Sequence, residues 1–106
     1  MNNDGIKYQV IVSERAAELL VSHIRFVARV SQQAAEDLRK KIIESAKMLE
    51  ELPERGSWLI DPNLPRNKYR KLVVESRYML ICQVKDCMVY VDSIIDCRRD
   101  YPWIIY

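Results

Sequence analysis

The sequence has little of what flexible, secreted or membrane-spanning chains need. It has two glycines and four prolines among 106 residues, too few for a disordered or linker-rich chain. No stretch approaches the roughly 20 apolar residues that cross a bilayer. The first residues, MNNDGIKYQV, lack the basic-then-apolar profile of a signal peptide. We therefore expect a cytoplasmic protein with no membrane contact, and the length predicts a single domain, residues 1–106.

Metal ligands and disulfide partners are also scarce. Cys82, Cys87 and Cys97 are spaced by five and ten residues, which fits no zinc pattern, and the only histidine, His23, is far from them. We expect reduced cysteines, no metal site and no cofactor. His23 falls on the apolar stripe of a predicted helix, so we expect an interior or boundary residue there and not a catalytic group.

The sequence does contain a succession of periodic segments. The alternating segment KYQVIV predicts a strand, and apolar residues at helical spacing then predict one helix over about 14–30 and another to about residue 52. Ser13 and Ser31 are the expected N-caps. Because almost no loop separates the helices, they should form an antiparallel hairpin. Three strand-like runs follow, KYRKLVV, RYMLICQV and MVYVDSII, with gaps short enough for β-hairpins.

These elements define the expected fold. The segment PERGSWLIDPNLPRN between the second helix and the later strands predicts a loop with at most a very short strand. The first strand must join the later three, because alone it leaves its apolar face unburied. The order β-α-α-β-β-β predicts an α+β protein of two layers, with the helical hairpin packed on a twisted, mainly antiparallel sheet.

Charge is unevenly distributed, although the net charge is only +2. Residues 1–52 balance eight basic with eight acidic side chains, whereas RNKYRKLVVESR has five basic residues and one acid. A second basic stretch, DCRRDY, follows the last predicted strand. It is either a grip for a polyanion or a solvated strand end, in which Arg98 and Arg99 pair with Asp96 and Asp100 at about 0–1 kcal/mol each. Solvated outer helix faces with i,i+4 partners are expected for the helix arginines Arg15, Arg25, Arg29 and Arg39.

The chain resembles the RelE/ParE superfamily, the toxins of bacterial type II toxin–antitoxin pairs. The resemblance rests on YQVIVSERAAELL, LEELPERG and KYRKLVVESRYMLICQVKDCMVYVDSIIDCRRDY, in this order and spacing. It implies a cognate antitoxin as partner. An acidic or amphipathic segment of that antitoxin should lie over the sheet and meet Arg70, Arg77, Arg98 and Arg99.

The superfamily includes ribosome-dependent mRNA endonucleases, which are RelE-like, and poisons of DNA gyrase, which are ParE-like. RNA cleavage needs a base, an acid and cations that stabilise the pentavalent phosphate. A RelE-like resemblance implies catalytic and RNA-binding groups on the later strands. The catalytic candidates are Arg77, Arg98, Arg99 and Tyr101, and the RNA-binding candidates are Lys68, Arg70 and Lys71.

Met79 stands where RelE-like nucleases usually have an arginine. Arg77, two residues earlier, is expected on the same face of the sheet as a partial substitute. Glu75 or a lysine would have to serve as the general base. Because the cations concentrate on the C-terminal strands, the sequence favours a ribosome-dependent mRNA endonuclease, with the ribosome and mRNA as partners. The alternatives are a gyrase poison, favoured by the long helical hairpin, and an inactive toxin-fold binding protein, favoured by Met79.

Overall fold

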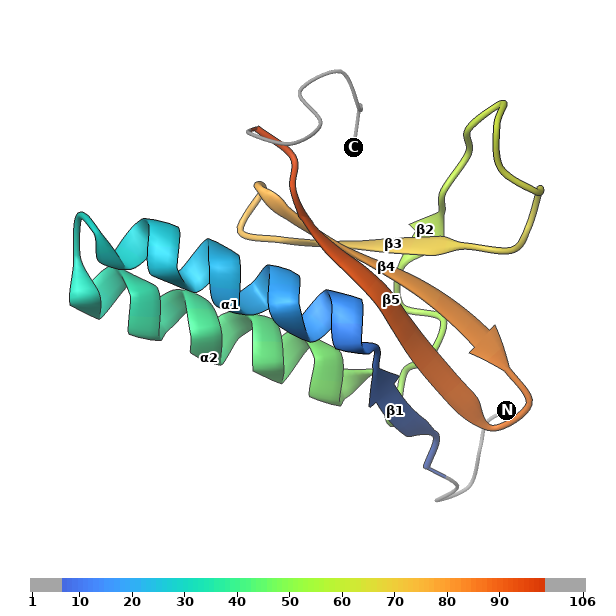
Figure 1. Cartoon of the computed structure of the whole chain (residues 1–106). Coiled ribbons are helices and arrows are strands. Elements are labelled where there is room, and N and C mark those ends of the chain that lie inside the picture. Colours follow the sequence, from blue (N-terminus) through green and yellow to red (C-terminus); the bar gives the residue numbers. More distant parts are fainter. Residues whose placement is uncertain (1–6, 99–106) are drawn as a thin grey trace.

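The structure is a computed structural model, and it describes residues 7–98. The two helices lie side by side on one face of a twisted sheet, and their connecting end extends beyond it (Figure 1). This is the predicted two-layer α+β architecture, and the proline-rich segment contains only the shortest of the strands. In chain order the elements are β1 (Gln9–Val12), α1 (Glu14–Ala28), α2 (Gln32–Met48), β2 (Ser57–Trp58), β3 (Arg70–Val74), β4 (Tyr78–Lys85) and β5 (Met88–Asp96).

The sheet is mainly antiparallel, as predicted. Its strand order is β1-β5-β4-β3-β2, and only the β1–β5 pair is parallel. A parallel pair needs a long crossover, and the helical hairpin provides part of it. The connections from β3 to β4 and from β4 to β5 are short turns with positive φ at Glu75, Ser76 and Asp86. These tight turns fix the antiparallel register, in which Tyr78 pairs with Asp96.

Both predicted N-caps are present. The Ser13 hydroxyl accepts the Ala16 N–H at 3.0 Å and donates to the Asp92 carbonyl oxygen at 3.0 Å, so it begins α1 and fixes the helix to β5. Ser31 accepts the Ala34 N–H at 3.1 Å and begins α2. Both helices end before the predicted positions, because a turn of two or three residues follows each regular segment.

Apolar side chains pack on both faces of the sheet. The main core lies under the helices, on what we call the helix face, and includes Ile42 of α2, Leu80 of β4 and Val91 of β5. Since neighbouring residues of a strand point to opposite faces, Met79 and Ile81 lie on the other side, which we call the second face. There they form a smaller cluster with Cys97, Leu59, Tyr69 and Ile95. None of the helices in residues 7–98 is long and apolar enough to span a membrane.

The three cysteines are free thiols in different surroundings, which leads to a testable prediction. Cys82 and Cys97 are buried, whereas Cys87 is exposed in the turn between β4 and β5. Burial raises the pKa of Cys82 to about 12, and the nearby Asp92 charge adds to the effect. In the native chain, a thiol-alkylating reagent at mildly alkaline pH should modify Cys87 about 100-fold faster than Cys82 or Cys97, whose reaction requires local opening.

Peptide mapping by mass spectrometry measures the three rates separately. The urea-unfolded chain is the control, because its three thiols should react at similar rates. Equal rates for Cys82 and Cys87 in the folded chain would contradict the burial of Cys82.

Candidate functional site

The Arg77 side chain makes a structural contact within the fold. It precedes β4, and its guanidinium donates from Nε and Nη2 to the two carboxylate oxygens of Asp96, at 3.1 and 2.9 Å. Asp96 is only 1% exposed and also accepts the backbone N–H of Arg98 at 3.1 Å. The hydrogen bond to Asp96 raises the pKa of Arg77, partly opposed by burial. A two-pronged bond to a buried carboxylate holds this guanidinium in place, so it is not available as a mobile group for a phosphate.

This geometry corrects the expected solvated strand end. Asp96 is buried, and its carboxylate forms an ion pair with Arg77. The Arg77 guanidinium also lies 5.4 Å from the ring centroid of Tyr78, which belongs to the helix-face core. Met79 points to the second face, whereas Asp96 pairs with Tyr78 of the helix-face core. Because the Arg77 guanidinium is bound to Asp96, it does not take the place of an arginine at Met79.

Arg70 is likewise held by neighbouring backbone. Its guanidinium carbon lies 4.0 Å from the ring centroid of Trp58, and its Nη1 donates to the carbonyl oxygen of Gly56 at 2.8 Å. The backbone of Gly56 approaches β3 so closely that a Cβ there would lie 2.4 Å from the Lys71 carbonyl oxygen. Arg70 therefore fastens the short edge strand β2 to the sheet by stacking and by a charge-assisted hydrogen bond.

The other candidate cations are more accessible. Lys68 is exposed, with its ammonium 5.3 Å from the Tyr69 ring centroid. Lys71 is half-buried and pairs with Ile81, which places it on the second face. Arg98 is exposed just after β5. Arg99 and Tyr101 lie outside the described residues.

The candidate residues that the structure describes do not converge on one centre. Arg70 pairs with Cys82, whereas Arg77 lies just before Tyr78, five positions from Cys82 along the chain. At about 3.3 Å per residue, this separation is about 16 Å. Arg70 shares the helix face with Leu72, and Lys71 lies on the opposite face. The described cations thus form one group near β2 and another at the Asp96 end of the sheet.

Groups that could serve as a general base are engaged in contacts of other kinds. His23, the only histidine of the chain, is buried, and its Nε2 lies 2.7 Å from the carbonyl oxygen of Ile94. This confirms the prediction of a satisfied interior residue. Glu75 pairs with Lys41 of α2 at 3.2 Å, in a turn exposed to solvent. In residues 7–98, no group of three or more His, Cys, Asp or Glu side chains is arranged to hold a metal ion.

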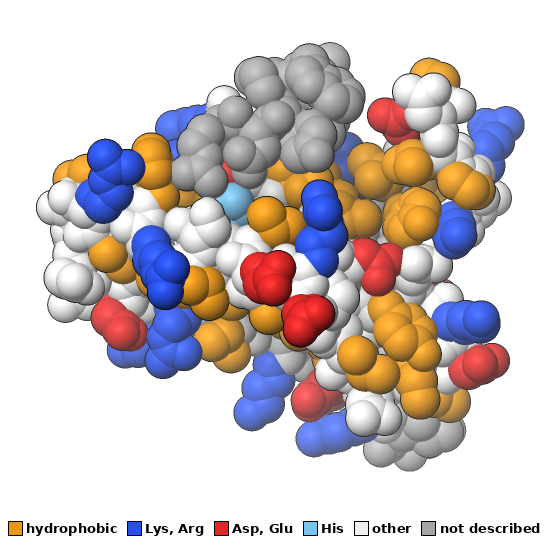
Figure 2. Space-filling model, in the orientation of Figure 1, with side chains coloured by type: hydrophobic (Ala, Val, Ile, Leu, Met, Phe, Trp, Pro, Cys, Tyr) orange, Lys and Arg blue, Asp and Glu red, His pale blue; other side chains and the backbone are white. Residues whose placement is uncertain are grey.

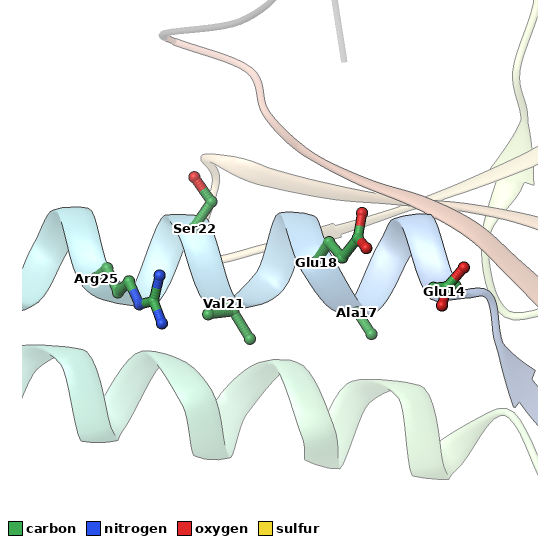
Figure 3. A pocket seen from close by; sticks show the side chains of 6 residues that line it. All are labelled: Glu14, Ala17, Glu18, Val21, Ser22 and Arg25. Carbon is green, nitrogen blue, oxygen red and sulfur yellow. The ribbon is translucent and has the colours of Figure 1, made fainter.

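The outer side of α1 has a feature that the sequence reading treated only as a solvated surface. Acidic side chains gather over the half of α1 near β1, and basic ones over the half near the hairpin turn (Figure 2). A shallow hollow of about 540 Å³ runs along this side (Figure 3). Among the described residues, the predicted i,i+4 ion pairs are missing for Arg15, Arg25 and Arg29, and Arg39 pairs instead with Glu36 at i,i+3. The hollow is lined by Glu14, Ala17, Glu18, Val21, Ser22 and Arg25.

Comparison with known proteins identifies the family. Among solved structures, the chromosomal ParDE toxin–antitoxin system from P. aeruginosa aligns with 87% of this chain and 98% of that chain, with a TM-score of 0.70 and 18% identity, which shows a shared fold. A mutant of the E. coli toxin RelE in the free state covers 86% of this chain and 84% of that chain, with a TM-score of 0.47 and 25% identity. A search of curated proteins gives no match.

The family assignment rests on the sequence match. Residues 10–101 match the model of the family described as "ParE toxin of type II toxin-antitoxin system, parDE". This match covers nearly the whole chain and agrees with the architecture, which confirms the RelE/ParE resemblance inferred from the strand and hairpin segments. The chain therefore belongs to the ParE toxin family of type II toxin–antitoxin systems.

Proposed function

We propose that this chain is a toxin that inhibits DNA gyrase and is held inactive by a cognate antitoxin. The observation that carries the proposal is that both arginines make structural contacts within the fold. Arg77 binds the Asp96 carboxylate, and Arg70 donates to the Gly56 carbonyl oxygen. The sequence favoured RNA cleavage because these cations seemed available to a phosphate. Their contacts support the ParE-like alternative instead.

The chemistry of RNA cleavage sharpens the contrast. A nuclease that works through the 2′-hydroxyl needs cations aimed at one phosphate, together with a proton acceptor close by. Here the two arginines lie at opposite ends of the strands, and Met79, where RelE-like nucleases usually carry arginine, is 0% exposed. His23 is buried against a backbone carbonyl. These placements give little support to a catalytic centre on the described strands.

The helical hairpin offers a surface suited to a protein target. Its connecting end extends past the sheet (Figure 1), and Val30 in that turn is 91% exposed. Phe26, about one helical turn before Val30 on α1, is 40% exposed. Apolar side chains displayed on a projecting tip are typical of a binding surface, because their exposure brings no benefit to the isolated chain. We infer that this tip contacts gyrase.

The antitoxin should cover a different part of the molecule. Lys68 and Arg98 are exposed, and Lys71 is half-buried on the second face. An acidic antitoxin segment laid over the sheet would meet these cations without displacing the internal contacts of Arg70 and Arg77. We therefore propose that inhibition by the antitoxin and action on gyrase use separate surfaces.

The experiment is induction of the full-length chain in a bacterial host, with and without the product of the adjacent gene. We expect growth arrest, reduced negative supercoiling of plasmids and DNA covalently trapped on gyrase. Messenger RNAs should keep their normal length. Co-expression of the adjacent product should restore growth, and the two proteins should co-purify. Truncated messages at ribosomes with undisturbed supercoiling would overturn the gyrase assignment.

A matched pair of variants tests the role of the tip. Val30→Asp places a charge in the exposed turn between the helices, and we expect it to reduce gyrase trapping at least tenfold, since buried apolar anchors dominate such contacts. Ile60→Asp is the control, because Ile60 is 83% exposed but lies in the loop after β2. Both variants should keep the wild-type melting temperature. Equal toxicity of the two variants would remove the tip from the target contact.

A further inference from the structure

The outer face of α1 has a charge order that is complementary to itself. Glu14, Glu18, Val21, Arg25 and Arg29 follow one another at spacings of four and three residues. At 3.6 residues per turn, these five positions fall within about 80° around the helix axis. All five are exposed, and Val21 is 46% exposed. The stripe is therefore acidic at one end, apolar in the middle and basic at the other end.

When two copies of this stripe lie antiparallel, the acidic end of each faces the basic end of the other. Consider a two-fold axis that crosses α1 midway between Val21 and Ser22. It places each residue of one copy opposite the residue of the second copy that is equally far from this midpoint in the sequence, on its other side. Glu18 then lies opposite Arg25 of the second copy, each about 5 Å from the axis along the helix. Glu14 lies opposite Arg29 of the second copy, each about 11 Å from the axis. The symmetry repeats both pairs, so the contact has four ion pairs around an apolar centre.

Within residues 7–98 of one chain, these charges form no ion pairs, although the Arg29 guanidinium lies 5.6 Å from the Phe26 ring centroid. Glu14 and Glu18 are like charges at i,i+4, as are Arg25 and Arg29, and such pairs each cost about 0.2–0.5 kcal/mol in a helix. The helix dipole favours Glu14 in the first turn and Arg25 in the last. It does not explain Glu18, because the effect of the dipole falls off after the first turn. No ion pair within residues 7–98 involves Glu14, Glu18 or Arg25.

The shape of the surface agrees with the charge order. The side chains that line the hollow all come from α1, with Ala17 between the two glutamates and Val21 between Glu18 and Arg25 (Figure 3). A small residue beside an apolar one leaves room for the side chains of an approaching helix. We propose that this face of α1 binds the same face of a second copy of the chain, with the two helices antiparallel.

The expected dimer is weak. A contact limited to α1, 15 residues and about 22 Å long, is smaller than the roughly 1,600 Å² of a standard interface. We therefore expect a Kd of about 0.1 mM, with much of the specificity coming from the ion pairs. The hairpin tips point in opposite directions in this dimer, so Val30 stays accessible. The inference thus goes beyond the proposed function and does not depend on it.

Charge reversal at one end of the stripe tests the ion pairs of the proposed dimer. One variant has Glu14→Lys and Glu18→Lys, and the other has Arg25→Glu and Arg29→Glu. Each variant places like charges opposite one another in its own dimer, so self-association measured by sedimentation equilibrium should weaken at least about tenfold. An equimolar mixture of the two should form a heterodimer, because every pair across the interface is again of opposite sign.

The controls keep the outcome unambiguous. Circular dichroism verifies that both variants are folded, and Lys40→Glu together with Lys47→Glu changes the same number of charges on exposed positions of α2. That control should dimerise like the wild type. High salt should weaken wild-type association. A wild type that stays monomeric at about 1 mM, roughly tenfold above the expected Kd, overturns the proposal. So does a mixture of variants that does not associate, or a wild-type dimer that the reversals leave unchanged.

Discussion

Arg77→Ala should lower the free energy of unfolding by about 3 kcal/mol. The Asp96 carboxylate is 1% exposed and receives both arms of the Arg77 guanidinium, at 3.1 and 2.9 Å. Removing one partner of a buried ion pair leaves the other charge in a poorly solvated place, which costs far more than losing an exposed pair. Urea denaturation monitored by circular dichroism measures the change.

Two further variants test this explanation. Arg98→Ala should change stability by less than about 0.5 kcal/mol, because Arg98 is exposed and contacts Asp96 only through its backbone N–H. Arg77→Ala combined with Asp96→Asn should recover at least half of the loss, since the amide still accepts the Arg98 N–H and no buried charge remains. If the double variant is no more stable than Arg77→Ala, an uncompensated charge is not the cause of the loss.

This prediction changes how toxicity assays are interpreted. From the sequence, loss of toxicity in Arg77→Ala would be taken as loss of a catalytic cation. In the folded chain, the same result follows from unfolding, because the arginine anchors the Asp96 end of β5 to the start of β4. Arg98 is the better probe of a cation at this end of the sheet, since its removal leaves the fold intact.

The elements of the fold were predictable because local chemistry determines them. Ser13 and Ser31 cap the helices where the apolar periodicity begins, and the short gaps after Val74 and Lys85 permit only antiparallel neighbours. Strand β1 had to join the sheet to bury Val10, which it does. Its parallel pairing with β5 depends on how the helical hairpin crosses the sheet, and periodicity carries no information about that crossing.

The site was less predictable because the partner of an arginine is set by tertiary contacts. Arg77 and Asp96 are 19 residues apart and meet because Tyr78 pairs with Asp96 across two strands. Arg70 meets Gly56 because a two-residue strand, too short for any periodicity to reveal, lies beside β3. A count of basic residues identifies cations, but it does not distinguish those that face solvent from those that hold the chain together.

Met79→Arg should be the most damaging single change, with a loss of at least about 3 kcal/mol. The substitution supplies the arginine that RelE-like nucleases usually have at this position. In this chain, however, Met79 is 0% exposed and packs in the second-face cluster with Ile81 and Cys97. Arginine would place a charge among these apolar side chains, and the described members of the cluster include no carboxylate. We expect a lower melting temperature and no gain of RNA cleavage.

Met79→Leu is the matched control, because a hydrophobic exchange of similar volume usually costs less than about 1.5 kcal/mol. It separates the effect of charge from that of a changed shape. The gyrase proposal predicts different toxicities for the two variants. Met79→Leu should retain toxicity, whereas Met79→Arg should lose it through unfolding. A Met79→Arg chain that melts like the wild type and cuts messages at ribosomes would mean that the second face is a nuclease site lacking only one cation. The buried packing of Met79 with Ile81 and Cys97 argues for the opposite result, because this cluster stabilises the sheet on the side that the helices leave uncovered.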